Sequence, residues 1–167
     1  MLNFTKGEKT MPKIPKVIHF CWFGGAEYPE LIKKCIASWK KYLPEYEIVK
    51  WSEENFDINC NQYVKEAYEN KKWAFITDYV RLYALYNYGG VYLDSDVEVL
   101  KPIDEFLDNE AFSGFESRDT VPTAIMASVK GQRFMGELLH DYDNRKLILE
   151  DGSIDMTANT VVITESC

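Results

Sequence analysis

Two aspartates, Asp94 and Asp96, stand on either side of Ser95, directly after an apolar stretch. In a fully extended strand, side chains two residues apart point to the same side, so both carboxylates would face one ligand. Such oxygen ligands suit Mg²⁺ or Mn²⁺, which take one or two protein carboxylates and complete their shell with water and substrate phosphates. A plain turn is the alternative interpretation, because Asp and Ser favour turns. The tripeptide thus makes Asp94 and Asp96 candidate metal ligands, with the turn left open.

A second charged pair, Asp78 and Arg81, lies on a predicted helix that runs from about Trp73 to Tyr88. Residues three apart on a helix share a face, and this pair interrupts an otherwise apolar and aromatic sequence. The pair is therefore a candidate part of a binding site. A local salt bridge on a solvated face is the alternative.

Trp22 stands near the end of the apolar run 15–23, which predicts a strand buried on both faces. Core packing is the favoured interpretation of this side chain, and a platform on which a nucleobase stacks is the alternative. His19 lies on the same run and is predicted to be a hydrogen-bonded core histidine rather than a ligand. Because His140 is the only other histidine, a multi-histidine metal site within this chain is excluded.

The elements around these residues predict an α/β fold. A strand over 15–23, a helix between Pro29 and Pro44 and a strand over 46–51 form a strand-helix-strand unit, which predicts a right-handed crossover and a parallel sheet. Ligands of such sheets bind at the carboxyl ends of the strands, where Trp22 stands. The predicted apolar face of this first helix consists of Leu31, Cys35, Ile36, Trp39 and Leu43.

The second half of the chain continues the alternation. The helix over 73–88 is expected to bury Phe75, Tyr79, Leu82, Tyr83 and Tyr86 and to end at Gly89-Gly90. A buried strand over 91–94 follows, and 96–100 is expected to continue it in extended form up to Pro102. Beyond an aromatic segment over 111–115, a strand is predicted over 124–129, and then an amphipathic helix built on Phe134, Leu138, Leu139 and Tyr142.

Composition limits the class of protein. The 167 residues suit one domain, and 46% hydrophobic with 14% aromatic residues can form a packed core. A formal net charge of -8 argues against nucleic acid as a partner. No apolar stretch is long enough to span a bilayer, and no signal peptide is visible, so a cytoplasmic location is expected, compatible with peripheral association at the inner face of the membrane. The four cysteines are expected to be reduced, buried thiols, with Cys21 and Cys35 in the core.

Three segments together resemble a known family. They are IPKVIHFCWFGG over 14–25, DYVRL over 78–82 and YGGVYLDSD over 88–96. In this order they resemble the DXD-containing sugar transferases of glycosyltransferase family 32, which include capsule and surface-polysaccharide transferases and mannosyltransferases, with the large clostridial glucosylating toxins as distant relatives. The resemblance is continuous from about residue 12 to residue 115.

The resemblance implies a GT-A type α/β fold, a nucleoside diphosphate sugar donor, Mn²⁺ or Mg²⁺, retention of anomeric configuration, and a glycan or lipid-linked saccharide as acceptor. Carried over to this sequence, Asp96 would bind the metal directly, and Asp94 would contact the ribose and reach the metal through water. The donor would be held by the remaining matched residues: Trp22 against the base, Asp78 and Arg81 on sugar and phosphate, and Tyr92 in the same pocket.

The resemblance also sets the expected domain organisation. Residues 1–13 are expected to be a flexible segment, and 14–167 the catalytic domain, with its C-terminal part missing because 159–164 resembles an internal segment of the family. Residues 116–123 depart from close relatives. Two other functions stay open: a non-catalytic module that binds nucleotide sugar or carbohydrate, and a metal-dependent nucleotide-sugar hydrolase that uses water as acceptor.

Overall fold

The computed structural model describes residues 13–114, 121–157, 160, 163 and 164. The expectations for the segment 1–13 therefore fall outside the described residues except for Lys13. Phe115, Cys167 and half of 159–164 also fall outside them. None of the described helices combines the length and apolar character needed to cross a membrane.

A five-stranded sheet forms the centre of the fold, in the order β2-β1-β3-β5-β4. The strands are β1 (Val17–Cys21), β2 (Glu47–Trp51), β3 (Gly90–Leu93), β4 (Ala111–Ser113) and β5 (Ile125–Ser128). β1 pairs in parallel with β2 and β3, as predicted. β5 runs against both β3 and β4, so the sheet is mixed.

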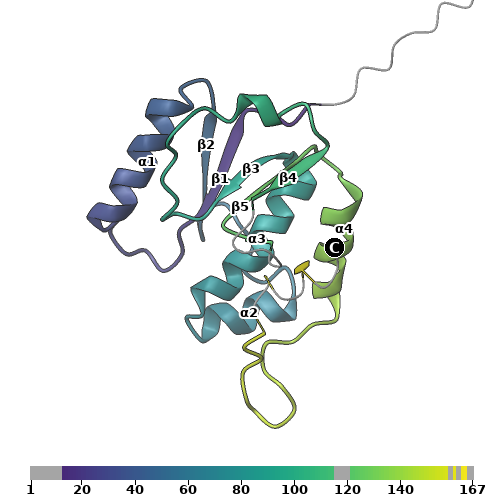
Figure 1. The fold of residues 1–167 in the computed structure, drawn as a ribbon. Coiled ribbons are helices and arrows are strands. Elements are labelled where there is room, and N and C mark those ends of the chain that lie inside the picture. Colours follow the sequence, from purple (N-terminus) through teal and green to yellow (C-terminus); the bar gives the residue numbers. More distant parts are fainter. Residues whose placement is uncertain (1–12, 115–120, 158–159, 161–162, 165–167) are drawn as a thin grey trace, which may run out of the picture.

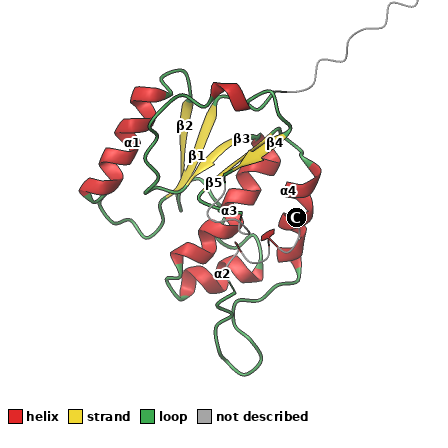
Figure 2. Ribbon diagram, viewed as in Figure 1, coloured by secondary structure: helices red, strands yellow, loops and turns green. Residues whose placement is uncertain are grey.

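The helices cover both faces of this sheet, as Figures 1 and 2 show. They are α1 (Glu30–Tyr42), α2 (Gln62–Glu69), α3 (Trp73–Tyr88) and α4 (Arg133–His140), with short 3-10 helices at Asp104–Phe106 and Asp141–Asp143. α1 packs on one face, and α2, α3 and α4 pack on the other.

Side chains of the strands alternate between the two resulting cores. Along β1, Ile18 and Phe20 join the core under α1, whereas Cys21 joins the core under α3. Tyr92 of β3 also faces α3, and its neighbours face α1. The four residues of β3 are all buried, which confirms the predicted buried strand.

The predicted apolar face of α1 is partly wrong. Leu31 is 58% exposed, and Ile32 takes the buried position in the first turn, with Cys35 and Trp39 following at helical spacing. The helix begins at Glu30, after Pro29, and this start turns Leu31 away from the sheet. Cys21 and Cys35 are buried free thiols, as predicted, whereas Cys60 is free but exposed, so the prediction of a buried thiol is wrong for Cys60.

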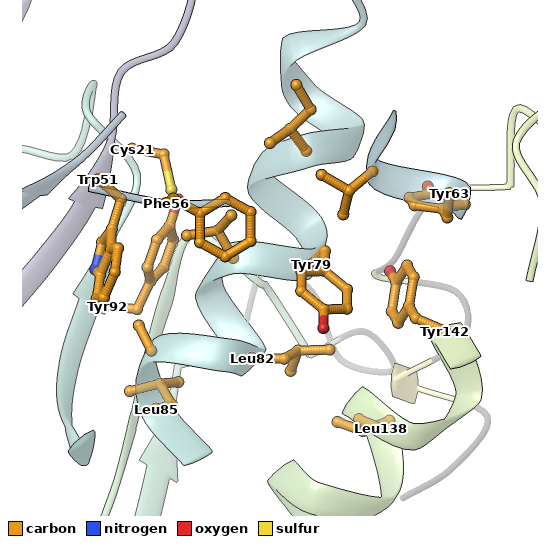
Figure 3. Packing of buried hydrophobic residues seen from close by; sticks show 14 of the residues in the cluster. Cys21, Trp51, Phe56, Tyr63, Tyr79, Leu82, Leu85, Tyr92, Leu138 and Tyr142 are labelled. Atoms are coloured by element: carbon orange, nitrogen blue, oxygen red, sulfur yellow. The ribbon is translucent and has the colours of Figure 1, made fainter. Parts of the chain in front are cut away.

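α3 has the predicted bounds but buries more than one face. Tyr86, predicted to be buried, is 38% exposed, and Phe75 and Tyr83 are half-buried. Figure 3 shows the reason: Cys21 and Tyr92 lie on one side of α3, and Tyr63 and Tyr142 lie on the other. The helix is enclosed by the sheet and by its helical neighbours, so the additional buried apolar residues are Ile76, Val80, Ala84 and Leu85.

Gly89 makes the tight connection from α3 into β3. Its φ is +69°, and a Cβ atom there would lie 2.6 Å from the backbone nitrogen of Lys130. Both facts require glycine. The connection fixes where β3 begins, and hence where the acidic residues after it emerge.

His19 is a satisfied core histidine, as predicted. Its Nδ1 lies 3.2 Å from the indole nitrogen of Trp51, which can only donate, so Nδ1 accepts and Nε2 donates to the carbonyl of Gly89 at 2.8 Å. Burial lowers the pKa of His19, and the bond to the Gly89 carbonyl opposes that effect only in part. The neutral ring therefore links β1 to β2 and to the α3–β3 connection.

The lowered pKa of His19 predicts acid sensitivity. Its pKa is below the ordinary value of 6.5, so its stabilising effect is fully present above that value and is lost as the pH falls and the unfolded chain takes up the proton. His19→Gln retains a donor and an acceptor but does not titrate. Between about pH 7.5 and pH 5, the free energy of unfolding should fall more steeply in the wild type than in His19→Gln, as measured by urea titration. Parallel curves would contradict this prediction.

Candidate functional site

The carboxyl ends of β1 and β3 border a cavity of about 280 Å³. β1 lies between β2 and β3 in the sheet, so the next two strands in sequence are placed on opposite sides of it. Ligands of open α/β sheets bind where the strand order reverses in this way. We call this space the acidic cavity. It is lined by Cys21, Ile32, Ala74, Thr77, Arg81, Tyr92, Asp94, Ser95 and Asp96.

Arg81 lies at the back of the acidic cavity and is 4% exposed. Its Nη2 lies 3.0 Å from Asp78 Oδ1 and 3.4 Å from Asp94 Oδ1. Nη1 donates to the carbonyl of Thr123 at 2.7 Å, and Nε donates more weakly to that of Thr77 at 3.4 Å. The predicted pair of Asp78 and Arg81 therefore exists, but it is buried rather than solvated.

The charges around Arg81 keep it protonated. Burial by itself would lower the pKa of the guanidinium, yet Tyr92, Asp94 and Asp78 together raise that pKa above its ordinary value. The guanidinium also lies 5.0 Å from the centre of the Tyr92 ring, within the range of a cation–π contact. A permanent positive charge is thus fixed between two carboxylates.

Tyr92 holds Asp94 from the strand side. Its hydroxyl donates to Asp94 Oδ1 at 2.9 Å, and burial raises the pKa of Tyr92 well above the usual value, so the donor proton stays in place. The same oxygen of Asp94 therefore accepts hydrogen bonds from both Tyr92 and Arg81. Its orientation is set by the protein.

Directly after Asp94 the chain forms a turn, the alternative interpretation of the tripeptide, instead of continuing the strand. The amide of Val97 donates to the carbonyl of Asp94 at 3.0 Å, which closes a turn over Asp94-Ser95-Asp96. The amide of Asp94 still bonds to the carbonyl of Ala124, so the chain turns directly after its last bond to the neighbouring strand segment. The tripeptide is thus a turn and still presents both carboxylates to one cavity.

Asp96 differs from Asp94 in its surroundings. It is exposed, and in the described part of the chain it has neither a hydrogen bond nor an ion pair. The described residues contain no cluster of three or more His, Cys, Asp or Glu side chains that could enclose a metal. Two carboxylates still fit Mg²⁺ or Mn²⁺, which keep several ligand positions for water and phosphate.

Trp22 lines a second cavity, of about 340 Å³, next to the end of β1. We call it the aromatic cavity, and it is lined by Trp22, Gly25, Ala26, Glu27, Tyr28, Lys50, Ser52, Glu53 and Glu54. The half-buried Trp22 packs edge-on against Tyr28, with 4.9 Å between ring centres, and its indole nitrogen donates to Ala26. Cys21 and Trp22 are consecutive, so they line different cavities.

Several residues of the site had no predicted role there. Thr123 contributes only a backbone carbonyl, which has no side-chain signature, and Thr77 could have been found because it lies one turn before Arg81. Cys21 was expected only as a core residue. Burial raises its pKa to about 12, so the thiol stays protonated in the acidic cavity.

Comparisons with known proteins agree on the family. A protein-family model described as capsular polysaccharide synthesis protein matches residues 1–149. The chain is similar to inositol phosphoceramide mannosyltransferase 3 of Schizosaccharomyces pombe, with 28% identity over 77% of this chain and 37% of that protein. Mannosyltransferase 1 of the same yeast is 30% identical over 65% of this chain and 36% of its own length. The chain therefore spans little more than a third of these relatives.

The fold is shared with a solved glycosyltransferase. PaToxG glycosyltransferase has a TM-score of 0.59 and 19% identity, covering 77% of this chain and 60% of that chain. This likeness confirms the predicted fold class. Together with the sequence relatives, it also confirms the resemblance to sugar transferases that the three motifs carry.

Arg81→Lys should destabilise the fold, because an ammonium group cannot replace the planar guanidinium toward Asp78, Asp94 and Thr123 together. We expect a loss of about 3 kcal/mol in the free energy of unfolding, measured by urea titration. Arg133→Lys is the matched control, since within the described residues Arg133 forms an exposed pair with Glu137. No measurable loss is expected there, and equal losses in both variants would contradict the prediction.

Proposed function

Because this chain belongs to the family of capsular polysaccharide synthesis proteins, we propose that it forms the donor-binding part of a metal-dependent glycosyltransferase. The donor is a nucleoside diphosphate sugar, and the acceptor is a glycan or lipid-linked saccharide in surface polysaccharide synthesis. The proposal rests above all on the acidic cavity, in which Asp94 is held by the protein and Asp96 is left open to a ligand.

The metal is assigned to Asp96 and Asp94. Asp96 is the direct ligand of Mn²⁺ or Mg²⁺, since its carboxylate is exposed to the cavity. Asp94 already accepts from Tyr92 and Arg81 through Oδ1, so it contacts the ribose and reaches the metal through water. When bound, the cation neutralises negative charge that grows on the departing diphosphate.

The remaining site residues receive complementary roles. Trp22 stacks on the base in the aromatic cavity, and Tyr92 closes the floor of the acidic cavity. Asp78, with its side chain 15% exposed, binds a hydroxyl of the sugar. Arg81 adds positive charge near the phosphates and orients Asp78 and Asp94, because its nitrogens already engage these carboxylates.

We propose retention of configuration by same-face attack. The sugar–phosphate C–O bond breaks as the bond to the acceptor oxygen forms, and the acceptor's proton passes to the departing phosphate oxygen. Asp78 is a poor nucleophile because it is paired with Arg81 at 3.0 Å. Trapping a sugar covalently attached to Asp78 or to another carboxylate would overturn this mechanism.

An assay with a panel of nucleoside diphosphate sugars and saccharide acceptors tests the proposed activity. Mannose donors come first, because the relatives are named mannosyltransferases. A metal-dependent transfer product supports the proposal. Free sugar without a transfer product would point instead to a hydrolase, and binding without turnover to a donor-binding module.

We also propose a cytoplasmic location at the inner face of the membrane, which fractionation of cells would test.

Asp96→Asn should abolish the metal-dependent stabilisation by a nucleoside diphosphate. The wild type should gain roughly 2.7 kcal/mol at a ligand concentration of 100 times Kd, read as a higher Tm with Mn²⁺ than with a chelator. Asp96 is exposed, so the variant should keep its Tm without ligand. Glu98→Gln removes a nearby exposed carboxylate outside the cavity and should respond like the wild type. An unchanged shift in Asp96→Asn would contradict the assignment.

Trp22→Ala should weaken nucleotide binding by about 1–3 kcal/mol, the usual contribution of stacking per base. Trp22→Phe keeps an aromatic face and should retain most of the affinity. Calorimetry with a nucleoside diphosphate and Mn²⁺ measures both variants. Equal affinities for Trp22→Ala and the wild type would remove Trp22 from the donor site.

A further inference from the structure

We call the turn over Asp94-Ser95-Asp96 the acidic turn. The segment 97–100, which follows it, leaves the sheet and runs along α1. Residues 97–100 belong to none of the described strands, so no ladder of strand hydrogen bonds fixes them. We infer that α1, through Trp39 and Ser38, positions Asp96 for the metal by holding this segment. The inference rests on the proposed function, which makes Asp96 a metal ligand.

Trp39 makes the first of the two contacts. Its side chain is fully buried, and its indole nitrogen donates to the carbonyl of Val97 at 2.8 Å. The edge-on contact of its ring with Phe20 of β1, at 5.3 Å between centres, fixes the indole against the sheet. The residue directly after Asp96 is thereby tied to a rigid part of the core.

Ser38 makes the second contact, two residues further on. Its hydroxyl oxygen accepts from the amide of Val99 at 2.9 Å and donates to the carbonyl of Cys35 at 2.6 Å. Both bonds are buried, so losing either partner leaves a polar group without water. A salt bridge between Lys34 and Glu98 is exposed and contributes little by comparison.

The two contacts matter for Asp96 because its own side chain is held by nothing in the described structure. Asp94 is fixed from the α3 side by Arg81 and Tyr92, and the turn closes from Asp94 to Val97. Trp39 and Ser38 fix the other end of the turn from the α1 side. The backbone of Asp96 therefore stands between two fixed points, which set where its side chain leaves the chain at the cavity.

The experiment compares buried substitutions of the same kind. Trp39→Phe and Ser38→Ala remove the two contacts. Trp51→Phe and Ser128→Ala are their matched controls: each removes a buried hydrogen bond, to His19 and to Leu85, away from the acidic turn. A purely structural role of α1 predicts the same outcome for variants and controls.

Two readouts separate positioning from stability. Without metal, amide hydrogen exchange by NMR should be faster at Val99 in Ser38→Ala and across 97–99 in Trp39→Phe, and unchanged there in the controls. With a saturating nucleoside diphosphate, paramagnetic resonance of free Mn²⁺ gives the metal Kd. We expect Mn²⁺ to bind roughly 10-fold more weakly to Trp39→Phe and Ser38→Ala, as is typical when the support of a ligand is removed.

The outcomes are distinct. Faster exchange at 97–99 with weaker Mn²⁺ binding in both variants, and in neither control, supports the inference. Unchanged exchange, unchanged Mn²⁺ affinity or equal losses in the controls would each overturn it and leave the proposed function intact. A wild-type protein that binds no Mn²⁺ would overturn the proposed function and this inference with it.

Discussion

The buried guanidinium of Arg81 is the interaction on which the site depends. A cation removed from water is tolerated only when charges and carbonyls surround it, and here the partners come from α3, from the end of β3 and from the segment before β5. Three parts of the chain, far apart in sequence, are therefore held at fixed positions around one planar group. Leaving any of these partners unpaired would cost free energy, so the local fold and the geometry of the acidic cavity depend on each other.

This arrangement gives the two aspartates of the turn, Asp94 and Asp96, different surroundings. Asp94 is part of the buried network, since it accepts from Tyr92 and Arg81, whereas Asp96 contributes nothing to that network and faces the cavity. A carboxylate already committed to two donors is a weaker direct metal ligand than one with both oxygens open. The motif contains the same residue type at both positions. The two carboxylates differ because Tyr92 and Arg81 contact Asp94 and do not contact Asp96.

Much of the fold could be predicted from patterns along the chain. The bounds of α3, the buried β3 and the role of His19 follow from apolar runs, helical spacing and the glycine pair at 89–90. The exposure of Leu31 and Tyr86 could not be predicted, because helical spacing gives a period and not the rotation at which a helix meets its neighbours. α3 adds a second difficulty, since its several buried faces weaken the amphipathic pattern.

The candidate site was predictable to a similar degree. Asp78, Arg81, Tyr92 and Asp94 were expected together only through the family resemblance, and the structure places them together. The antiparallel β5 was not foreseen, and the turn at 94–96 was only the alternative interpretation of the tripeptide. The direction of β5 depends on its pairing with β3, a segment distant in sequence, and this pairing leaves no mark on either local sequence.

The alternation of side chains in β1 also explains why the proposed donor site consists of two cavities. Cys21 points to the α3 side and lines the acidic cavity, and Trp22 comes next and lines the aromatic cavity. A donor that uses both must cross the carboxyl end of β1, where Gly24 and Gly25 follow with positive φ. A diphosphate between base and sugar supplies a linker for such a crossing. The division of the site into two halves is thus a consequence of the strand geometry, and the recognition of base and of diphosphate can vary independently on the two sides of one strand.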